Sequence, residues 1–209
     1  MTKNLVIVFV KKATLGSVKT RLAKTIGDLG ALEVYKELLK ITKNAVAELS
    51  CDVRIYFSET IDDDGWPNYA NRIQSGTNLG ERMYNAFKDG FEDGYKNIVL
   101  IGSDLPDIST LHIEEGLAAL EKNQVVFGPA EDGGYYLIGL SQLPPGIFIN
   151  KPWSQPHLLK TTLLELEHLN ISFSTLEPLN DIDTYEDLIA SDFYMNNTKL
   201  QEKIQQFND

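Results

Sequence analysis

Short runs rich in β-branched and aromatic residues recur along the chain and predict strands. These runs are Leu5–Val10, Val53–Phe57, Asn97–Ile101, Val125–Gly128, Tyr135–Leu140 and Ile171–Leu176. Between them, apolar residues return at helical spacing, as at Leu32, Tyr35, Leu38 and Leu39, which indicates amphipathic helices. The predicted helices are Val18–Ile26, Leu29–Leu49, Asn78–Phe91, Ser109–Lys122, a segment beginning near Pro156, and Thr184–Phe193, with a further one as an option after Met195.

Strands that alternate with helices of this length predict βαβ units with right-handed crossovers. We therefore expect an α/β fold with a mostly parallel central sheet flanked by helices. The chain shows no internal repeat and no Pro/Ser-rich linker, so residues 1–209 are predicted to form a single domain with a polar C-terminal tail from about residue 195. Leu143–Gln155 contains three prolines and predicts a long loop, and long loops in compact domains are often functional.

Composition narrows the class of partner. The 209 residues include 43% hydrophobic and 23% charged side chains, as in ordinary globular proteins. Lys and Arg total 19 against 30 Asp and Glu, a net charge of −11, which argues against nucleic acid or an anionic membrane as the partner. A nucleotide stays compatible, because a local cationic pocket with a divalent metal holds phosphate on an acidic protein.

The cysteine and histidine content and the short apolar runs argue against disulfides, zinc sites and membrane spans. Cys51 is the only cysteine and the three histidines are scattered, so we expect no internal disulfide and no zinc site. The run LVIVFV is too short for a membrane span, and no cleavage site follows it. We therefore expect a cytoplasmic protein without a membrane partner, for which a homodimer is one option.

Ligands of open α/β sheets bind beyond the carboxyl ends of the strands. The first predicted strand is followed by KKATLGSVKTR, a glycine-bearing loop that enters a helix and carries Lys11, Gly16, Lys19 and Arg21. Such a loop suits phosphate, because it offers backbone N–H groups and cations; a solvated surface loop is the alternative. It matches neither the Walker A pattern nor GxGxxG, so an NAD site is unsupported.

Acidic residues follow two other predicted elements. Asp104 follows the strand Asn97–Ile101, and Asp183 lies in NDIDTYED. Carboxylates at such positions are natural Mg²⁺ ligands, and this interpretation is favoured for Asp104 over a helix cap or Asx-turn. For Asp183 a metal ligand and a helix cap are equally good interpretations. If both met the cationic loop, they would form a metal–diphosphate site in which the ion neutralises a departing phosphate.

The segment GPAEDGGYYLIG offers a third candidate. Gly133 and Gly134 permit close approach of a ligand to the backbone, and Asp132 supplies a carboxylate. A hairpin turn is the alternative, and the two are compatible. Tyr135 and Tyr136 are interpreted as packing residues.

Taken together and in order, KKATLGSVKTRL, QSGTNLGERM, IGSDLPDI, GPAEDGGYYLIGL and DIDTYEDL resemble an uncharacterised bacterial branch of the nucleotide-diphospho-sugar transferase superfamily. Its members are usually described as GT-A-type glycosyltransferases, some with radical-SAM or arsenosugar gene neighbourhoods. More distantly, the chain is similar to the guanylyltransferases for molybdenum cofactor and 2-phospholactate. The resemblance spans Phe9 to about Leu188.

The resemblance implies a GT-A fold that binds a nucleotide at the N-terminal half of the sheet, with Mg²⁺ or Mn²⁺ as cofactor. It implies roles for several residues by their motif positions. These are Lys19 and Arg21 on phosphates, Asp104 and Asp183 on the metal, Gln74, Gly80 and Arg82 near the base, and Asp132, Gly133 and Gly134 facing the sugar or acceptor. For Arg82, a position on the surface of a helix is the alternative.

Two departures from the family pattern bear on the reaction. Ala13 and Leu15 replace loop prolines of the family, and Asp104 is followed by Leu105 and Pro106, so the second aspartate of a DxD motif is absent. The first expectation is transfer of a sugar from a nucleotide-diphosphate donor to a small acceptor, with Asp104 and Lys19 at the leaving diphosphate and Asp132 as general base. The alternatives are transfer of a nucleotidyl group from an NTP to a phosphorylated small molecule, with release of pyrophosphate, and a non-catalytic nucleotide-binding module.

Overall fold

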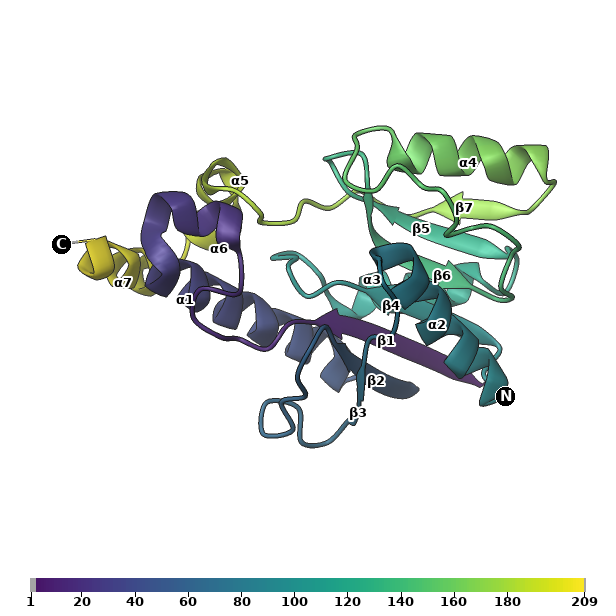
Figure 1. Cartoon of the computed structure of the whole chain (residues 1–209), viewed down its shortest axis with the longest axis horizontal. Coiled ribbons are helices and arrows are strands. Elements are labelled where there is room, and N and C mark those ends of the chain that lie inside the picture. Colours follow the sequence, from purple (N-terminus) through teal and green to yellow (C-terminus); the bar gives the residue numbers. More distant parts are fainter. Residues whose placement is uncertain (1–2, 209) are drawn as a thin grey trace.

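A seven-stranded sheet forms the centre of the molecule (Figure 1). The computed structural model describes residues 3–208, excluding the side chain of Asn208. In spatial order β3-β2-β1-β4-β6-β5-β7, the sheet is parallel except for β6, which is antiparallel to both of its neighbours. The strands are β1 (Asn4–Val10), β2 (Asp52–Phe57), β3 (Ala70–Ile73), β4 (Asn97–Ile101), β5 (Val125–Pro129), β6 (Tyr135–Leu140) and β7 (Phe173–Thr175).

Helices cover both faces of the sheet, as Figure 1 shows. They are α1 (Thr20–Ala47), α2 (Leu79–Glu92), α3 (Thr110–Ala119), α4 (Leu158–His168), α5 (Tyr185–Ala190), α6 (Asp192–Met195) and α7 (Thr198–Asn208). Side chains of β1 alternate between the two faces, because successive strand residues point to opposite sides. Val6 and Val8 pack in the cluster that contains α1 and α3 residues, and Ile7 packs in the cluster that contains α2 and α4 residues.

A third apolar cluster joins the two ends of the chain. Side chains from the first half of α1, including Leu22 and Ile26, pack with Leu188 of α5 and with Leu200 and Ile204 of α7. In Figure 1 these elements form a lobe beside the sheet. The segment after Met195 is therefore a helix with a buried apolar stripe, and not only a polar tail.

The predicted α/β fold with its mostly parallel sheet is confirmed, and the bounds of β4 and β6 match their predictions. The two predicted helices before residue 50 form one element, α1, which is kinked at Gly27 (φ 73°). The predicted helix Thr184–Phe193 is interrupted, because Ser191 is extended and its side chain caps α6 through the N–H of Tyr194. Strand β3 was missed: its sequence ANRI lacks an apolar run, and it is a mostly exposed edge strand.

No helix in the described part of the chain combines the length and the apolar character that a membrane span requires.

Candidate functional site

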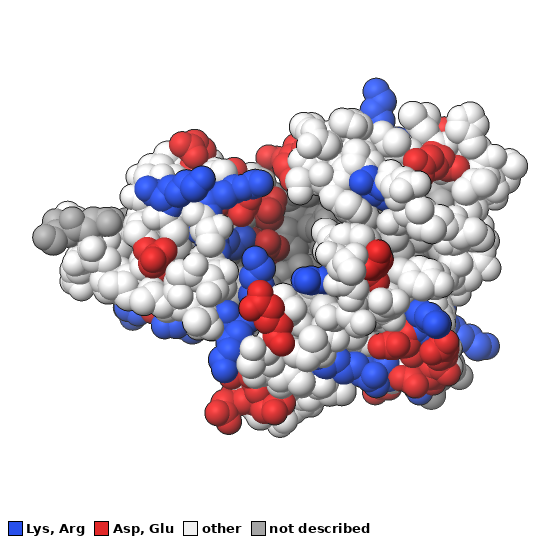
Figure 2. All heavy atoms as spheres, in the orientation of Figure 1, with Lys and Arg blue, Asp and Glu red and all other residues white. Residues whose placement is uncertain are grey.

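A pocket of about 580 Å³ opens at the carboxyl ends of β1 and β4. Residues after both strands line it, together with parts of α2, β6, the loop before α4, and the segment before α5. Figure 2 shows a hollow between the lobe and the sheet, with both acidic and basic side chains at its edge. The position agrees with the rule that ligands of α/β sheets bind beyond the strand ends.

Lys19 and Asp104 meet inside this pocket. The Nζ atom of Lys19 lies 3.2 Å from Oδ2 of Asp104. Lys19 itself is only 9% exposed, and its backbone is left-handed (φ 48°) at the N-cap of α1. A non-glycine residue in this conformation is strained and clusters at functional sites. The predicted convergence of the basic loop and the acidic strand end is thus present.

A second ion pair lies at the edge of the pocket. Arg21 Nη1 is 2.7 Å from Oδ2 of Asp183. Asp187 accepts hydrogen bonds from the backbone N–H groups of Asp183 and Thr184, and Thr184 caps α5. Asp183 therefore precedes a capping box in which Asp187 supplies the carboxylate, and its own carboxylate points to Arg21 and the pocket.

The N-terminus of α1 is open toward a ligand. Its first turn contains no acidic residue, and the N-cap side chain does not cap the first-turn N–H groups. The backbone N–H groups of a first helical turn have no partner within the helix and carry partial positive charge. Since Thr20 lines the pocket beside Lys19, this helix end and the lysine together favour an anion.

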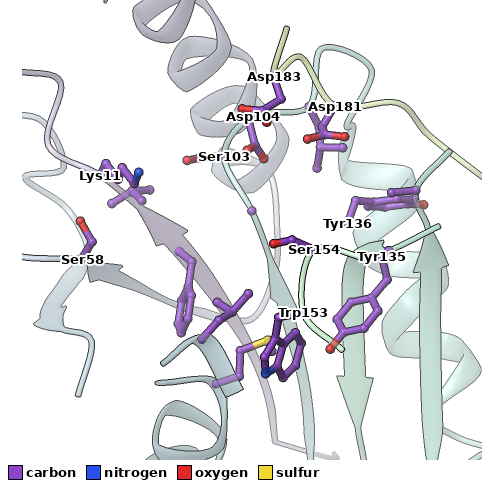
Figure 3. Close-up of a pocket in the computed structure, with 18 of the residues that line it drawn as sticks. Lys11, Ser58, Ser103, Asp104, Tyr135, Tyr136, Trp153, Ser154, Asp181 and Asp183 are labelled. Atoms are coloured by element: carbon purple, nitrogen blue, oxygen red, sulfur yellow. The ribbon is translucent and has the colours of Figure 1, made fainter. Parts of the chain in front are cut away.

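Asp181 is a third carboxylate of the pocket, and the sequence reasoning missed it. Figure 3 shows Asp104, Asp181 and Asp183 at one end of the pocket. Burial raises the pKa of Asp181 to about 6, and the negative charges of Asp104 and Asp132 add to this effect while Lys19 opposes it. The signal was present in the sequence, because NDIDT holds two aspartates two positions apart. Within residues 3–208, no three His, Cys, Asp or Glu side chains are placed to hold a metal ion by themselves.

Tyr35 of α1 joins the two loops that carry the charged groups. Its hydroxyl accepts a hydrogen bond from the Lys11 N–H (2.9 Å), donates to the Lys11 carbonyl (3.1 Å) and lies 3.2 Å from Ser103 Oγ. Burial of this hydroxyl raises the pKa of Tyr35. The tyrosine thereby fixes the end of β1 relative to the end of β4.

The part of the pocket next to β1, β2 and α2 carries polar groups suited to a nucleotide. It contains Lys11, Ser58, Gln74 and Arg82, and Lys11 and Ser58 appear on one side in Figure 3. Gln74 Nε2 donates to the Tyr56 carbonyl, and Arg82 Nε donates to the Gly76 carbonyl. These bonds hold both side chains in place and leave the Gln74 carbonyl and the terminal nitrogens of Arg82 for a ligand. We call this part the nucleotide half.

The opposite part of the pocket is aromatic and acidic. It is lined by Asp132, Tyr135, Tyr136, Trp153, Ser154 and Asp181, and in Figure 3 the two tyrosines lie across from Lys11 and Ser58. Asp132 Oδ1 accepts a hydrogen bond from the Gly134 N–H at 2.8 Å, which leaves its other oxygen for a ligand. The EDGG turn therefore presents a carboxylate. We call this part the acceptor half.

Four predicted site residues do not line the pocket. Gly16 (φ 75°) makes a turn near Asp28, and Gly80 lies under Phe148 and Trp153, where a Cβ would come within 2.8 Å of either. Gly133 (φ 89°) packs against the Pro156 carbonyl, and Arg21 stands outside the pocket lining with its side chain 66% exposed. Gly80 and Gly133 thus allow close packing next to the pocket, Gly16 makes a turn in the loop before α1, and Arg21 contacts the pocket lining only through Asp183. The other predicted residues, Lys11, Lys19, Gln74, Arg82, Asp104, Asp132, Gly134 and Asp183, all line it.

Solved structures place the fold in a class. A structure from Desulfovibrio desulfuricans, of a protein proposed to be a nucleotide-diphospho-sugar transferase, is similar with a TM-score of 0.86 and 28% identity, covering 99% of both chains. A 4-diphosphocytidyl-2C-methyl-D-erythritol synthase from Anaerococcus prevotii shares the fold at 14% identity, with a TM-score of 0.58 over 93% of this chain and 99% of that one. The chain therefore has the fold of nucleotidyl- and nucleotide-sugar transferases.

Sequence comparison then gives the family. Residues 41–155 match DUF2064, described as an uncharacterized protein conserved in bacteria, and the chain belongs to this family. The chain is also 26% identical to the 2-phospho-L-lactate guanylyltransferase of Methanocaldococcus vulcanius over 189 residues. This aligned region covers 87% of this chain and 82% of that protein.

Proposed function

We propose that this chain is a transferase that binds a nucleotide by its phosphates between Lys19 and the open N-terminus of α1. The observation that carries the proposal is the 3.2 Å pair between Lys19 and Asp104 inside the pocket. A buried lysine and a half-exposed aspartate in contact provide one cation for phosphate oxygens and one carboxylate for a divalent ion.

The acidic end of the pocket fits Mg²⁺ or Mn²⁺ as cofactor. Mg²⁺ is usually held by one or two carboxylates together with substrate phosphates, so a complete protein cage is not needed. Asp104, with Asp183 or Asp181, would hold the ion, and the mutual repulsion that contributes to the raised pKa of Asp181 would be relieved by a cation. A bound ion would supply charge neutralisation on the leaving phosphate.

Nucleotidyl transfer is the reaction that we favour. The guanylyltransferase relative and the cytidylyl-transferring structures of the same fold, one of them with bound CTP, support it. So does Pro106, which stands where the second aspartate of a DxD motif beginning at Asp104 would be. In this reaction an acceptor oxygen attacks the α-phosphorus of an NTP and pyrophosphate leaves. Lys19 orients the phosphates and stabilises the charge that develops on them.

A guanine base fits the nucleotide half. The free terminal nitrogens of Arg82 provide a planar fork of donors, and an arginine fork pairs with the O6 and N7 acceptors of guanine. The name of the relative agrees with this choice. GTP is therefore the first nucleotide to test.

Glycosyl transfer is the second candidate. It is favoured by the similarity to the proposed nucleotide-diphospho-sugar transferase, which spans 99% of both chains. The same pocket would then bind a nucleotide-diphosphate sugar, and the attack would take place at the sugar carbon with the nucleoside diphosphate as leaving group. Asp132, whose second oxygen is free, would act as the base toward the acceptor in either reaction.

One assay separates the two reactions. The protein is incubated with Mg²⁺ or Mn²⁺, with each NTP or each nucleotide-diphosphate sugar, and with small-molecule cell extract as the source of acceptor. Release of pyrophosphate from an NTP indicates nucleotidyl transfer, and release of a nucleoside diphosphate from a sugar nucleotide indicates glycosyl transfer. Binding without turnover indicates a nucleotide-binding module, and the absence of any nucleotide binding contradicts the proposal.

A further inference from the structure

We infer that the acceptor half of the pocket takes an uncharged hydroxyl compound with an apolar or aromatic face, and not a phosphate ester. The inference rests on the proposed function, which assigns the nucleotide to the other half. It concerns the chemical class of the second substrate, which differs from the phosphorylated acceptor expected from the sequence for the alternative of nucleotidyl transfer.

The first observation is the distribution of charge. All lysine and arginine side chains that line the pocket, namely Lys11, Lys19 and Arg82, belong to the nucleotide half or to its boundary. The acceptor half contributes the carboxylates Asp132 and Asp181 instead. A phosphate dianion bound there would face the Asp132 carboxylate, and Asp181 as well where Asp104 and Asp183 hold the metal ion, which costs free energy in a partly desolvated site.

The lysines nearest to the acceptor half are engaged elsewhere. Lys151 lies in the loop before α4, but it is buried and its ammonium group is paired with Glu165 of α4. Lys160 lines a separate shallow groove with Gly133 and Leu163. Neither Lys151 nor Lys160 lines the pocket, so neither is placed to neutralise an anion bound there.

Helix N-termini near the acceptor half are also occupied. At α2, the Asn78 side chain accepts from the Glu81 N–H, and the Glu81 carboxylate accepts from the Thr77 N–H. A carboxylate of the protein thus already lies next to this helix end, where it repels a second anion. At α4, the N–H groups of Leu158 and Leu159 donate to the carbonyls of Gln155 and Gly133. Each of these helix ends thus has a capping bond or a first-turn carboxylate that the first turn of α1 lacks.

The remaining groups of the acceptor half suit neutral hydroxyls. Tyr135 and Trp153 offer ring surface, and in Figure 3 the Tyr135 side chain points toward Trp153. The Tyr135 hydroxyl makes no hydrogen bond within the described part of the chain, and burial raises its pKa, so it stays neutral as donor and acceptor. The free oxygen of Asp132 accepts a hydrogen bond from a hydroxyl. Apolar faces stack on the rings while hydroxyls meet the polar atoms.

In the proposed nucleotidyl transfer, the nucleophile is then the hydroxyl oxygen of the acceptor. Its bond to the α-phosphorus forms as the bond between that phosphorus and pyrophosphate breaks, and the hydroxyl proton passes to the Asp132 carboxylate. The product is a phosphodiester between the nucleoside and the acceptor. A phosphate acceptor would give a nucleoside-diphosphate compound instead.

Two matched probes test the class of acceptor: phenyl β-D-glucoside, which is neutral, and phenyl phosphate, which carries the same ring on a charged group. Both are titrated into the protein with saturating GDP and Mg²⁺, which keeps phenyl phosphate out of the nucleotide half. The Trp66→Phe variant leaves Trp153 as the one tryptophan of the sequence, so its fluorescence reports on the acceptor half. Calorimetry on the unmodified protein provides an independent measurement.

We expect a saturable change with phenyl β-D-glucoside and an affinity for phenyl phosphate that is weaker by about tenfold or more, the factor that about 1.4 kcal/mol of repulsion produces. The Gln155→Lys variant places a cation in the pocket lining, and it should strengthen phenyl phosphate binding without changing the glucoside affinity. Equal or tighter binding of phenyl phosphate to the unmodified protein would overturn the inference, and so would the absence of a Trp153 response to either probe. Failure of the proposed function shows separately, as an absence of GDP binding.

Discussion

Lys19 and Asp104 are 85 residues apart in the sequence, yet their charged atoms lie 3.2 Å apart in the pocket. Lys19 is the N-cap residue of α1 and has a strained, left-handed backbone. Asp104 lies in the loop after β4. Their contact brings a cationic loop and an acidic strand end into one site, and it is the basis of the first two predictions.

Replacing Lys19 with Met should weaken GDP binding by about tenfold or more, because a charge-assisted contact to phosphate contributes about 1.5–3 kcal/mol. Guanosine, which has no phosphates, should bind both proteins alike. Calorimetric titration measures both affinities. Lys12→Met is the matched control, since Lys12 is exposed and outside the pocket lining. An equal loss of guanosine affinity would show that Lys19 supports the fold of the pocket and not the phosphates.

Replacing Asp104 with Asn should remove the dependence of GDP affinity on Mg²⁺. Without the metal, the variant should bind GDP as well as the unmodified protein or better, because a negative charge next to the phosphates is gone. Titrations with Mg²⁺ and with EDTA give the comparison, and Asp107→Asn serves as the control at an exposed position of the same loop. A variant whose affinity still rises with Mg²⁺ would rule out Asp104 as a ligand.

Removing the Tyr35 hydroxyl as Tyr35→Phe should lower the free energy of unfolding by about 1–3 kcal/mol, since a buried donor–acceptor group loses its partners. The hydroxyl bonds both backbone atoms of Lys11 and lies beside Ser103, so nucleotide affinity should fall as well. Urea unfolding measures the stability. Tyr84→Phe, at an exposed position of α2, should change neither quantity.

Two glycine substitutions separate backbone strain from steric collision. Gly133 and Gly146 both have positive φ, at 89° and 77°, but a Cβ at Gly133 would lie 1.9 Å from the Pro156 carbonyl whereas a Cβ at Gly146 meets nothing within 4 Å. Gly146→Ala should cost about 1 kcal/mol for the left-handed conformation. Gly133→Ala should cost clearly more, or displace the loop at Pro156. Equal unfolding midpoints in urea would contradict the close packing at Gly133.

Stability in acid should depend on Asp93. Its hydrogen bond and ion pair with Arg54 lower the pKa of this carboxyl from its usual 3.8. A group with a lowered pKa stabilises the fold above its ordinary pKa, and this contribution is lost as the pH falls through the lowered value. Asp93→Asn should therefore be less stable at pH 7, and its stability should fall less steeply between about pH 5 and pH 2. Thermal unfolding across this range tests the slope, with exposed Asp64→Asn as control.

Much of the fold follows from local pattern. The buried strands β1 and β4 are short β-branched runs, and Asn78 with Glu81 marks the start of α2. What pattern does not reveal depends on partners distant in sequence. Ala70–Ile73 becomes a strand only because β2 offers an edge to pair with, and the C-terminal helix is held by Leu200 and Ile204 against α1.

The site was predictable in its chemistry and less so in its geometry. Strand ends identified Lys19, Asp104 and Asp132, because they follow β1, β4 and β5, whose carboxyl ends lie at the same edge of the sheet. Spacing alone does not tell which aspartate of NDIDT faces inward, and both Asp181 and Asp183 do. The glycines illustrate the same limit, since Gly80 and Gly133 are required by the atoms of Trp153 and Pro156 packed on them.

The ion pair between Arg21 and Asp183 spans 162 positions of the sequence. During translation, the ribosome therefore releases the loop that carries Lys19 and Arg21 long before the segment that carries Asp183 has been made. A nascent protein lacks this ion pair until its C-terminal part has emerged and docked on α1. The complete pocket thus belongs to the finished polypeptide, and premature termination ahead of Asp183 would leave a sheet without the proposed nucleotide site.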